Sequence, residues 1–297
     1  MLADLRQQLR HLPPGLRTRF APSPTGYLHM GHAASAVFVW GIAQAIQADV
    51  LLRIEDHDQG RVRQEYTAGI LEDLQWLGLI KDSSPFIQQS QHQERYQKVF
   101  QEWEKKNLIF ACTCSRKEIQ ERTGENSTNE LRYDGHCRKA KHPHQQAGTR
   151  LLLEDQSFYF DDLWLGSQIQ RPAEQCGDLL LRDRDRNWTY NFSVSVDDAL
   201  EEIDLIIRGQ DLLSASGRQL QLRALLGCSR SLQFIHHPLI WESTGQKLSK
   251  RDGSTALRSL REKGMRPETL LGQAAFQIGL LEQPRDIFAD QLGAFFS

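Results

Sequence analysis

Short apolar runs alternate with longer stretches of helical periodicity over the first hundred residues. The apolar runs end in polar or turn-forming residues, which is typical of buried parallel strands. The longer stretches repeat apolar positions with the period of a helix, and one of them closes at Gly78. The pattern predicts strands at 16–21, 49–56 and 85–90, and helices at 31–48, 64–77 and 91–106. This alternation favours a doubly wound α/β fold with a parallel sheet.

The alternation breaks at Cys112. From there to about Gly148 the chain is polar and rich in Lys, Arg, His, Asn and Gly, so we interpret this stretch as an insertion that needs its own support. Beyond it, strands are predicted at 149–154 and within 158–170. Residues 178–209 are predicted to form a strand, a charged turn, a strand or the start of a helix, and then a further strand. Helical periodicity returns at 216–226 and in the tail, around 258–264 and 268–281.

These changes of pattern define the expected domains. Residues 1–16 are an N-terminal extension with leucines at roughly helical spacing, either a short helix or disordered, which Pro13 and Pro14 end. Residues 17–227 form a Rossmann-like domain that contains the insertion at about 108–148. Residues 228–297 form a small C-terminal helical subdomain.

Composition and charge narrow the class of protein. The 297 residues are 39% hydrophobic and 25% charged, an ordinary globular balance in a chain long enough for two packed units. The net charge of −2 means that any contact with nucleic acid must come from a local basic face. An odd number of cysteines, five, without a signal peptide or anchor, favours a reduced cytoplasmic protein with no membrane partner, which we expect to be a monomer.

The stretch Arg19–His32, RFAPSPTGYLHMGH, carries the first candidate chemistry. A helix that begins directly after a strand and a tight turn offers free N–H groups and the positive end of its dipole to a phosphate. Gly31 leaves room for a nucleotide close to the backbone. His29 and His32 lie three apart, so both rings can face one way and stabilise charge that develops on a phosphoryl group.

A second motif lies about 215 residues further on. It is KLSKR, Lys247 to Arg251, in a polar loop between Gly245 and Gly253, which suggests a mobile loop. Taken separately, paired histidines and a lysine run are common surface features. Together and in this order they resemble the HIGH and KMSKS signatures of the class I aminoacyl-tRNA synthetases. RFAPSPTGYLHMGHA with RIEDHD resembles the glutamyl branch, and the resemblance runs from about Arg17 to the C-terminus.

The resemblance implies an enzyme that activates L-glutamate with ATP and Mg²⁺, with residues 17–227 as its catalytic domain. The residues implied to be catalytic are His29, His32 and Lys250. Those implied to bind ATP are His29, Gly31, His32, Lys247 and Lys250. Those implied to bind glutamate are Arg19, Phe20, Ala21, Pro22, Ser23, Glu55, Tyr190 and Arg208.

Within the implied glutamate site, Arg19 and Arg208 would hold carboxylate oxygens, Glu55 would meet the ammonium, and Tyr190 would line the side-chain pocket. The planar fork of arginine suits a carboxylate. These residues stand at the ends of predicted strands, where α/β proteins bind ligands. The chain departs from the family pattern at Gln210, where glutamyl synthetases commonly have Glu.

Three cysteines of the insertion form a candidate metal site. One residue separates Cys112 from Cys114, and Cys137 follows further along the chain. A metal ion bound by such cysteines can stabilise the fold of a polar segment that has no hydrophobic core. Chemistry alone favours His136 or His142 as the fourth ligand, because imidazole is the commoner partner. The family pattern C-x-C…Y-x-x-x-C instead implies one structural Zn²⁺ held by Cys112, Cys114, Tyr133 and Cys137. We interpret the remaining cysteines, Cys176 and Cys228, as ordinary buried thiols.

The chain stops soon after the lysine loop, so we expect no anticodon-binding domain. In this it resembles the glutamyl-queuosine tRNA(Asp) synthetase family, which transfers glutamate to queuosine at the wobble position. The implied partner is the anticodon loop of tRNA(Asp), with Arg132, Arg138, Lys139 and Lys141 as a candidate basic grip. Three alternatives stay open: a truncated glutamyl synthetase that charges a tRNA 3′ end, an inactive synthetase-like RNA-binding protein, and a nucleotidyltransferase, which shares an HxGH loop.

Overall fold

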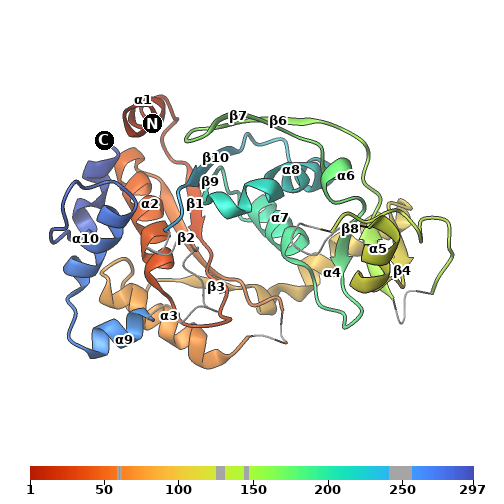
Figure 1. Ribbon diagram of the computed structural model, residues 1–297, viewed down its shortest axis with the longest axis horizontal. Coiled ribbons are helices and arrows are strands. Elements are labelled where there is room, and N and C mark those ends of the chain that lie inside the picture. Colours follow the sequence, from red (N-terminus) through yellow and green to blue (C-terminus); the bar gives the residue numbers. More distant parts are fainter. Residues whose placement is uncertain (59, 61, 125–130, 144–146, 241–255) are drawn as a thin grey trace.

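The computed structural model describes residues 1–58, 60, 62–124, 131–143, 147–240 and 256–297. The molecule is elongated, with the parallel strands and their helices between two ends (Figure 1). The C-terminal helices α9 (Leu257–Glu262) and α10 (Pro267–Gln277) form one end, and α5 (Arg116–Thr123) lies at the other. The two chain termini lie close together beside the C-terminal helices.

A parallel sheet forms the centre of the fold. Among the described residues its strands are β1 (Arg17–Phe20), β2 (Asp49–Ile54), β3 (Phe86–Gln88), β9 (Leu205–Gly209) and β10 (Gln233–His237). β2 pairs with β1 and with β3, and β10 pairs with β9, all in parallel. These strands form two ladders, β3-β2-β1 and β9-β10, which meet where the N–H of Asp204 donates to the carbonyl of Arg17 at 3.0 Å, so β9 lies beside β1 in the order β3-β2-β1-β9-β10. The predicted α/β fold class is confirmed.

Helix α2 (Met30–Ile46) is buried on almost every side, which explains why its sequence is apolar all round rather than on one stripe. It packs between the sheet and the C-terminal elements α10 and η4 (Ala289–Phe295). The N-terminal extension is helical, as α1 (Leu2–Leu9), and buries Leu5 and Leu9 in the same core.

The other helices connect or cover the strands. They are α3 (Gln64–Trp76), η1 (Gln89–His92), α4 (Gln93–Lys105), α7 (Tyr190–Leu200), η3 (Gln210–Ala215) and α8 (Ser216–Leu225). None of the described helices is long and apolar enough to cross a lipid bilayer.

Two further units contain antiparallel strands, and one of them adjoins the parallel sheet. β6 (Phe158–Asp162) forms a hairpin with β7 (Gly166–Gln170) and lies next to β10. β4 (Ile109–Cys112), β5 (Gly148–Leu151) and β8 (Leu179–Arg182) form a separate small sheet, with α6 (Pro172–Gln175) between β7 and β8. Cys112 lies opposite Gly148 in this register, so the two ends of the predicted insertion meet as paired strands.

The structure differs from the prediction at several element boundaries. Tyr190 begins helix α7 rather than ending a strand, and the strand predicted at 149–154 ends at Leu151. β10 belongs to the parallel sheet, so the sheet continues beyond residue 227, where we predicted the first domain to end. Cys176 is buried as predicted, whereas Cys228 is only partly buried.

Candidate active site and metal centre

The parallel strands end at a cleft of about 1090 Å³. Open α/β sheets bind ligands at this edge, beyond the carboxyl ends of the strands. Every described residue that we predicted to bind glutamate or ATP lines the cleft, namely Arg19, Phe20, Ala21, Pro22, Ser23, His29, Gly31, His32, Glu55, Tyr190 and Arg208. Lys247 and Lys250, in the predicted lysine loop, lie outside the described residues.

The two histidines form the N-terminal cap of α2. Nδ1 of His29 accepts a hydrogen bond from the N–H of Gly31 at 3.1 Å, and Nδ1 of His32 accepts one from the N–H of His29 at 3.1 Å. Because Nδ1 is the acceptor in both rings, each neutral imidazole carries its proton on Nε2, which can donate to a phosphate oxygen. A Cβ on Gly31 would lie 2.9 Å from Cε1 of His29, so this packing requires glycine.

Arg208, at the end of β9, is held by uncharged side chains. Its Nε donates to Nε2 of His236 at 3.0 Å, Nη1 to Oε1 of Gln219 at 2.8 Å, and Nη2 to Oγ of Ser216 at 2.9 Å. His236 accepts on Nε2, so its proton is on Nδ1, which donates to Oδ2 of Asp162 at 2.6 Å.

Burial lowers the pKa of the Arg208 guanidinium and also that of His236. Among the described residues, the hydrogen bonds of Arg208 to His236, Gln219 and Ser216 fix its position without supplying a carboxylate. A guanidinium has five N–H donors, so this one can still present donors to a ligand. The arrangement suits an acidic ligand that brings its own negative charge into the cleft.

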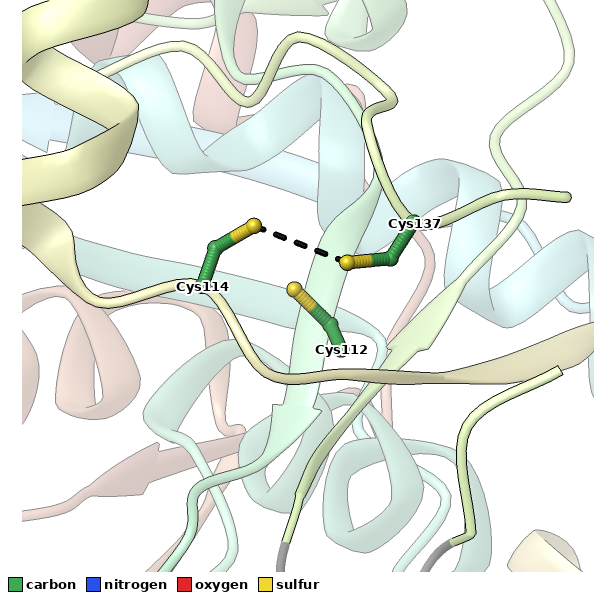
Figure 2. Close-up of side chains that lie close together, drawn as sticks. All are labelled: Cys112, Cys114 and Cys137. Carbon is green, nitrogen blue, oxygen red and sulfur yellow. Dashed lines mark hydrogen bonds between the residues drawn. The ribbon is translucent and has the colours of Figure 1, made fainter. Parts of the chain in front are cut away.

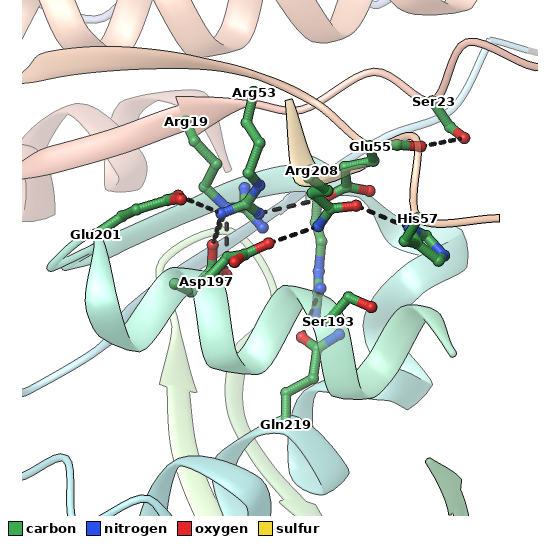
Figure 3. A network of polar contacts seen from close by, with 12 residues as sticks. Arg19, Ser23, Arg53, Glu55, His57, Ser193, Asp197, Glu201, Arg208 and Gln219 are labelled. Atoms are coloured by element: carbon green, nitrogen blue, oxygen red, sulfur yellow. Dashed lines mark hydrogen bonds and ion pairs between the residues drawn. The ribbon is translucent and has the colours of Figure 1, made fainter. Parts of the chain in front are cut away.

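Arg19 and Glu55 belong to a second network, which is densely charged (Figure 3). Arg19 Nε lies 3.3 Å from Oδ1 of Asp198. Arg53, fully buried in β2, places Nη2 3.2 Å from Oε1 of Glu55 and Nη1 2.8 Å from Oδ1 of Asp198. Further ion pairs join Arg53 to Glu201 and Arg95 to Asp197 and Glu201.

The pKa values of these acids follow from burial and from the neighbouring guanidiniums. Burial raises the pKa of Glu55, and Arg53 acts in the opposite direction. Burial also disfavours ionised Asp198, but Arg19 and Arg53 outweigh it and lower the pKa of that carboxyl. A cationic ligand group beside Glu55 would favour its ionised form, which is the form that binds an ammonium.

The positions of the other predicted residues are also defined. Tyr190 lines the cleft from the first turn of α7, and burial raises the pKa of its phenol. Gln210 begins η3 and is not among the residues that line the cleft, whereas Asp211 is. Ser23 Oγ donates to the carbonyl of Glu55 at 3.0 Å, which ties the turn after β1 to the end of β2.

Sequence reasoning missed the residues that hold this site in place. They are Arg53, Asp162, Asp197, Asp198, Glu201, Gln219 and His236. Arg53 did leave a signal, because an arginine inside an otherwise apolar strand must find partners when it is buried. The contacts of Arg208 left none, because its partner His236 lies on another strand, and Asp162, which holds His236, lies on the β6–β7 hairpin far away in sequence.

Three cysteine sulfurs of the insertion converge on one point (Figure 2). The Sγ atoms of Cys112, Cys114 and Cys137 lie within 4.8 Å of one another, and those of Cys114 and Cys137 are 3.5 Å apart. Oη of Tyr133 lies 3.5 Å from Sγ of Cys112. Tetrahedral bonds of about 2.3 Å to sulfur and about 2.1 Å to oxygen require spacings of this size, so the residues fit a four-coordinate metal ion.

The thiols differ in how readily they ionise. Burial would raise the pKa of Cys137, but hydrogen bonds from the Thr113 backbone, Tyr133, Cys114 and His142 outweigh it and lower the pKa to about 6. Burial raises the pKa of Cys114 to about 11. His142 thus contacts one sulfur, whereas His136 is exposed.

The insertion is fastened to the rest of the fold by polar contacts. Arg138 pairs with the buried carboxylate of Asp178 at 2.6 Å, so this member of the predicted basic grip has a structural contact. The N–H of Tyr133 donates to the carbonyl of Cys176 at 2.9 Å. A Cβ on Gly177 would lie 2.0 Å from the Tyr133 carbonyl oxygen, so only glycine permits this approach.

Comparison with known proteins agrees with the geometry of the cleft. Residues 15–291 match the family described as tRNA synthetases class I (E and Q), catalytic domain. The chain is 36% identical to glutamyl-Q tRNA(Asp) synthetase of Nitratidesulfovibrio vulgaris over 90% of this chain and 87% of that protein. It is 35% identical to glutamate–tRNA ligase 1 of Alkalilimnicola ehrlichii over 95% of this chain, but spans 60% of that longer protein.

Solved structures support the same fold. A glutamate tRNA ligase from Elizabethkingia meningosepticum, in complex with its amino acid, superposes with a TM-score of 0.74 at 24% identity, covering 93% of this chain and 64% of that one. At this identity the likeness speaks for the fold alone. The family model, however, spans almost the whole chain, and the chain therefore belongs to the class I tRNA synthetases of the glutamate and glutamine (E and Q) group.

Proposed function

We propose that the protein activates L-glutamate with ATP and transfers the glutamyl group to queuosine at the wobble position of tRNA(Asp). The observation that carries the first step is Arg208, buried in the cleft, with uncharged hydrogen-bond partners and Arg19 nearby. Glutamate supplies the two carboxylates and the ammonium that Arg208, Arg19 and Glu55 suit.

In the activation step, a glutamate carboxylate oxygen attacks the α-phosphorus of ATP in line, and pyrophosphate leaves. His29 and His32 donate hydrogen bonds from Nε2 to the phosphoryl oxygens as negative charge develops there. Lys247 and Lys250, assigned from the KLSKR motif, neutralise the leaving pyrophosphate. Bound Mg²⁺ would share this charge. Arg19 and Arg208 hold the substrate so that the reacting carboxylate faces ATP.

The choice of acceptor rests on the glutamyl-Q relative, because similarity to it covers most of both chains. Queuosine carries a cyclopentene diol, and a diol hydroxyl can attack the adenylate carbonyl as a ribose hydroxyl does. The similarity to glutamate–tRNA ligase 1 favours a second candidate, in which glutamate is attached to a tRNA 3′ end. ATP and tRNA as substrates imply a cytoplasmic location for either activity.

Two acceptors separate these candidates once glutamate-dependent pyrophosphate exchange is established. One is tRNA(Asp) that carries queuosine but lacks its 3′ terminal adenosine, and the other is intact tRNA(Asp) with unmodified guanosine. We expect glutamate on the first and none on the second. The reverse result would assign the protein to 3′ end charging instead.

We further propose that Cys112, Cys114, Tyr133 and Cys137 hold one structural Zn²⁺. The spacings of the sulfur atoms and of the Tyr133 oxygen support this set. The ion would stabilise the fold of the insertion and would lie away from the site where ATP reacts. Zinc analysis of the purified protein tests it, and Tyr133→Phe against His142→Ala identifies the fourth ligand, because only loss of the true ligand lowers zinc affinity.

A further inference from the structure

His57 is a cleft residue that the proposed activation step does not use. It follows β2, two residues after Glu55, and both side chains line the large cleft. Asp56, between them, faces away and accepts hydrogen bonds from Ser90 at 2.7 and 2.5 Å. His57 also lines a smaller cavity of about 200 Å³ that shares Trp188 with the cleft. It therefore lies where the glutamate site meets a second space.

A buried relay fixes the tautomer of the neutral His57 ring. The Asp197 carboxylate can only accept, so the atom of Gln89 that lies 2.7 Å from it is Nε2, the donor. The other amide atom of Gln89, Oε1, can only accept, and it lies 2.8 Å from Nδ1 of His57. Nδ1 therefore carries the proton, and Nε2 of the neutral ring bears a lone pair. Gln89 and Asp197 are both buried, so this orientation is rigid.

The His57 side chain lines the cleft in which transfer would occur. If Glu55 binds the ammonium of glutamate, the reacting carbonyl carbon is only about 2.5 Å from that nitrogen. Glu55 and His57 project from one short segment onto the same cleft, so a carbonyl held beside Glu55 would lie in the space that His57 also lines. Among the described residues, none hydrogen-bonds to Nε2 of His57.

We propose that His57 is the general base of the transfer step, an inference that rests on the function proposed above. Nε2 takes the proton of the acceptor hydroxyl as its oxygen forms a bond to the carbonyl carbon of glutamyl adenylate. The bond from that carbon to the phosphate oxygen then breaks, AMP leaves with the bonding electrons, and the imidazolium later releases its proton to water. Gln89 and Asp197 are positioning residues, which hold the ring in the orientation and tautomer that present Nε2 to the cleft.

The test measures the two half-reactions separately. Glutamyl adenylate is formed first, tRNA is added, and transfer is followed in a single turnover on whichever acceptor the wild-type enzyme uses. In His57→Ala, transfer should fall at least about a hundredfold more than pyrophosphate exchange does. Added imidazole should restore at least a tenth of the lost rate, because it can occupy the space that the ring leaves. His57→Gln, which keeps the side-chain bulk, should show the same loss, and His92→Ala is the matched histidine control.

The outcomes distinguish the two proposals. Transfer by both His57 variants within about threefold of wild type, or a loss that imidazole does not restore, would overturn the role of His57 while glutamate activation stands. Failure of the wild-type enzyme to exchange pyrophosphate with glutamate would overturn the proposed function and this inference with it. Gln89→Met, which removes the relay at nearly constant volume, should slow transfer by about tenfold more than it slows exchange.

Discussion

At the residue scale, the histidines that begin α2 combine a structural and a proposed chemical role. His32 caps the helix through Nδ1, and its proton is therefore on Nε2. We predict that His32→Asn, whose amide oxygen can still accept from the His29 N–H, folds normally but loses at least about a hundredfold in glutamate-dependent pyrophosphate exchange. His92→Asn, outside the cleft, is the control. Exchange by His32→Asn within about twofold of wild type would remove His32 from this role.

The hydrogen-bond partners of Arg208 lead to a prediction about substrate choice. Its uncharged partners leave a buried guanidinium to be neutralised by the ligand. The side-chain amide of glutamine carries no charge, so the buried guanidinium would stay unpaired, at a cost on the order of several kcal/mol. We therefore expect exchange with glutamate to exceed exchange with glutamine, and with the shorter aspartate, by at least about a hundredfold. Equal rates with glutamine in an amino-acid panel would contradict this reading of the pocket.

Which residues line the cleft was predictable where a local motif carries them, and the contacts that hold them were unpredictable where the partners lie far along the chain. Arg19, His29 and His32 stand within one short motif and do line one cleft. The contact between Arg208 and His236 joins neighbouring strands that a whole helix separates in sequence. Such a contact depends on sheet order and register, which the pattern of apolar residues does not specify.

At the scale of secondary structure, α7 is a further case in which the sequence pattern does not specify the tertiary contacts. Phe192, Val194 and Val196 alternate with serines, a period of two that is typical of a strand, yet the segment is helical. Tertiary contacts explain the difference, because Asp197 and Asp198 reach the buried guanidiniums from this helix. By contrast, β1 and β2 were predicted to within two residues at each end, since each is a short segment with apolar residues that ends in turn-forming or acidic residues, as buried parallel strands do.

Packing of α3 against α9 gives a pH-dependent prediction. Asp73 is fully buried on α3, and its nearest cation is Arg261, 3.6 Å away. Burial raises the pKa of Asp73 to about 6, above its ordinary value of 3.8. The folded state therefore binds more protons than the unfolded state between these values, and stability falls as pH rises through this window.

Asp73→Asn should then raise the free energy of unfolding by about 1–2 kcal/mol above pH 7, with the gain vanishing near pH 4. Urea unfolding of the variant and wild type across this range measures it. Glu72→Gln is the matched control, since its exposed carboxylate also pairs with Arg261 but has no such burial. A gain that does not change with pH would contradict the assignment to Asp73.

The cysteine cluster leads to a prediction about how removal of the metal would affect the insertion. If Zn²⁺ joins Cys112, Cys114 and Cys137, chelation should loosen α5 and the segment 131–140 while the parallel sheet keeps its protection. Hydrogen exchange by mass spectrometry compares the two regions directly. Cys137→Ser should reproduce the effect, and Cys228→Ser, outside the cluster, should not. Uniform protection with and without chelator would argue against a structural metal.

At the scale of the whole molecule, the chain ends meet around the helix that begins at the cleft. Arg6 on α1 donates to the carbonyl of Phe295 at 2.9 Å, so the first and last elements contact each other. Phe296 is almost fully buried, and the centroid of its ring lies 5.3 Å from that of Phe38 on α2. Phe38 in turn stacks on His237, which lines the cleft, at 4.8 Å.

These ring contacts link Phe296 to the cleft, so substitution of Phe296 tests whether the C-terminal segment is part of the catalytic core. A Cβ on Gly41 would lie 2.5 Å from the Phe296 ring, so the ring fills the groove that this glycine leaves on α2. Phe296→Ala should therefore open a cavity and cost about 3–5 kcal/mol of unfolding free energy, in a single cooperative transition shared with the sheet. Phe288→Ala removes the same ring from a site that is 54% exposed and should cost less than about 0.5 kcal/mol. Equal losses for the two variants, or an early transition confined to the C-terminal helices, would mean that this segment folds apart from the cleft.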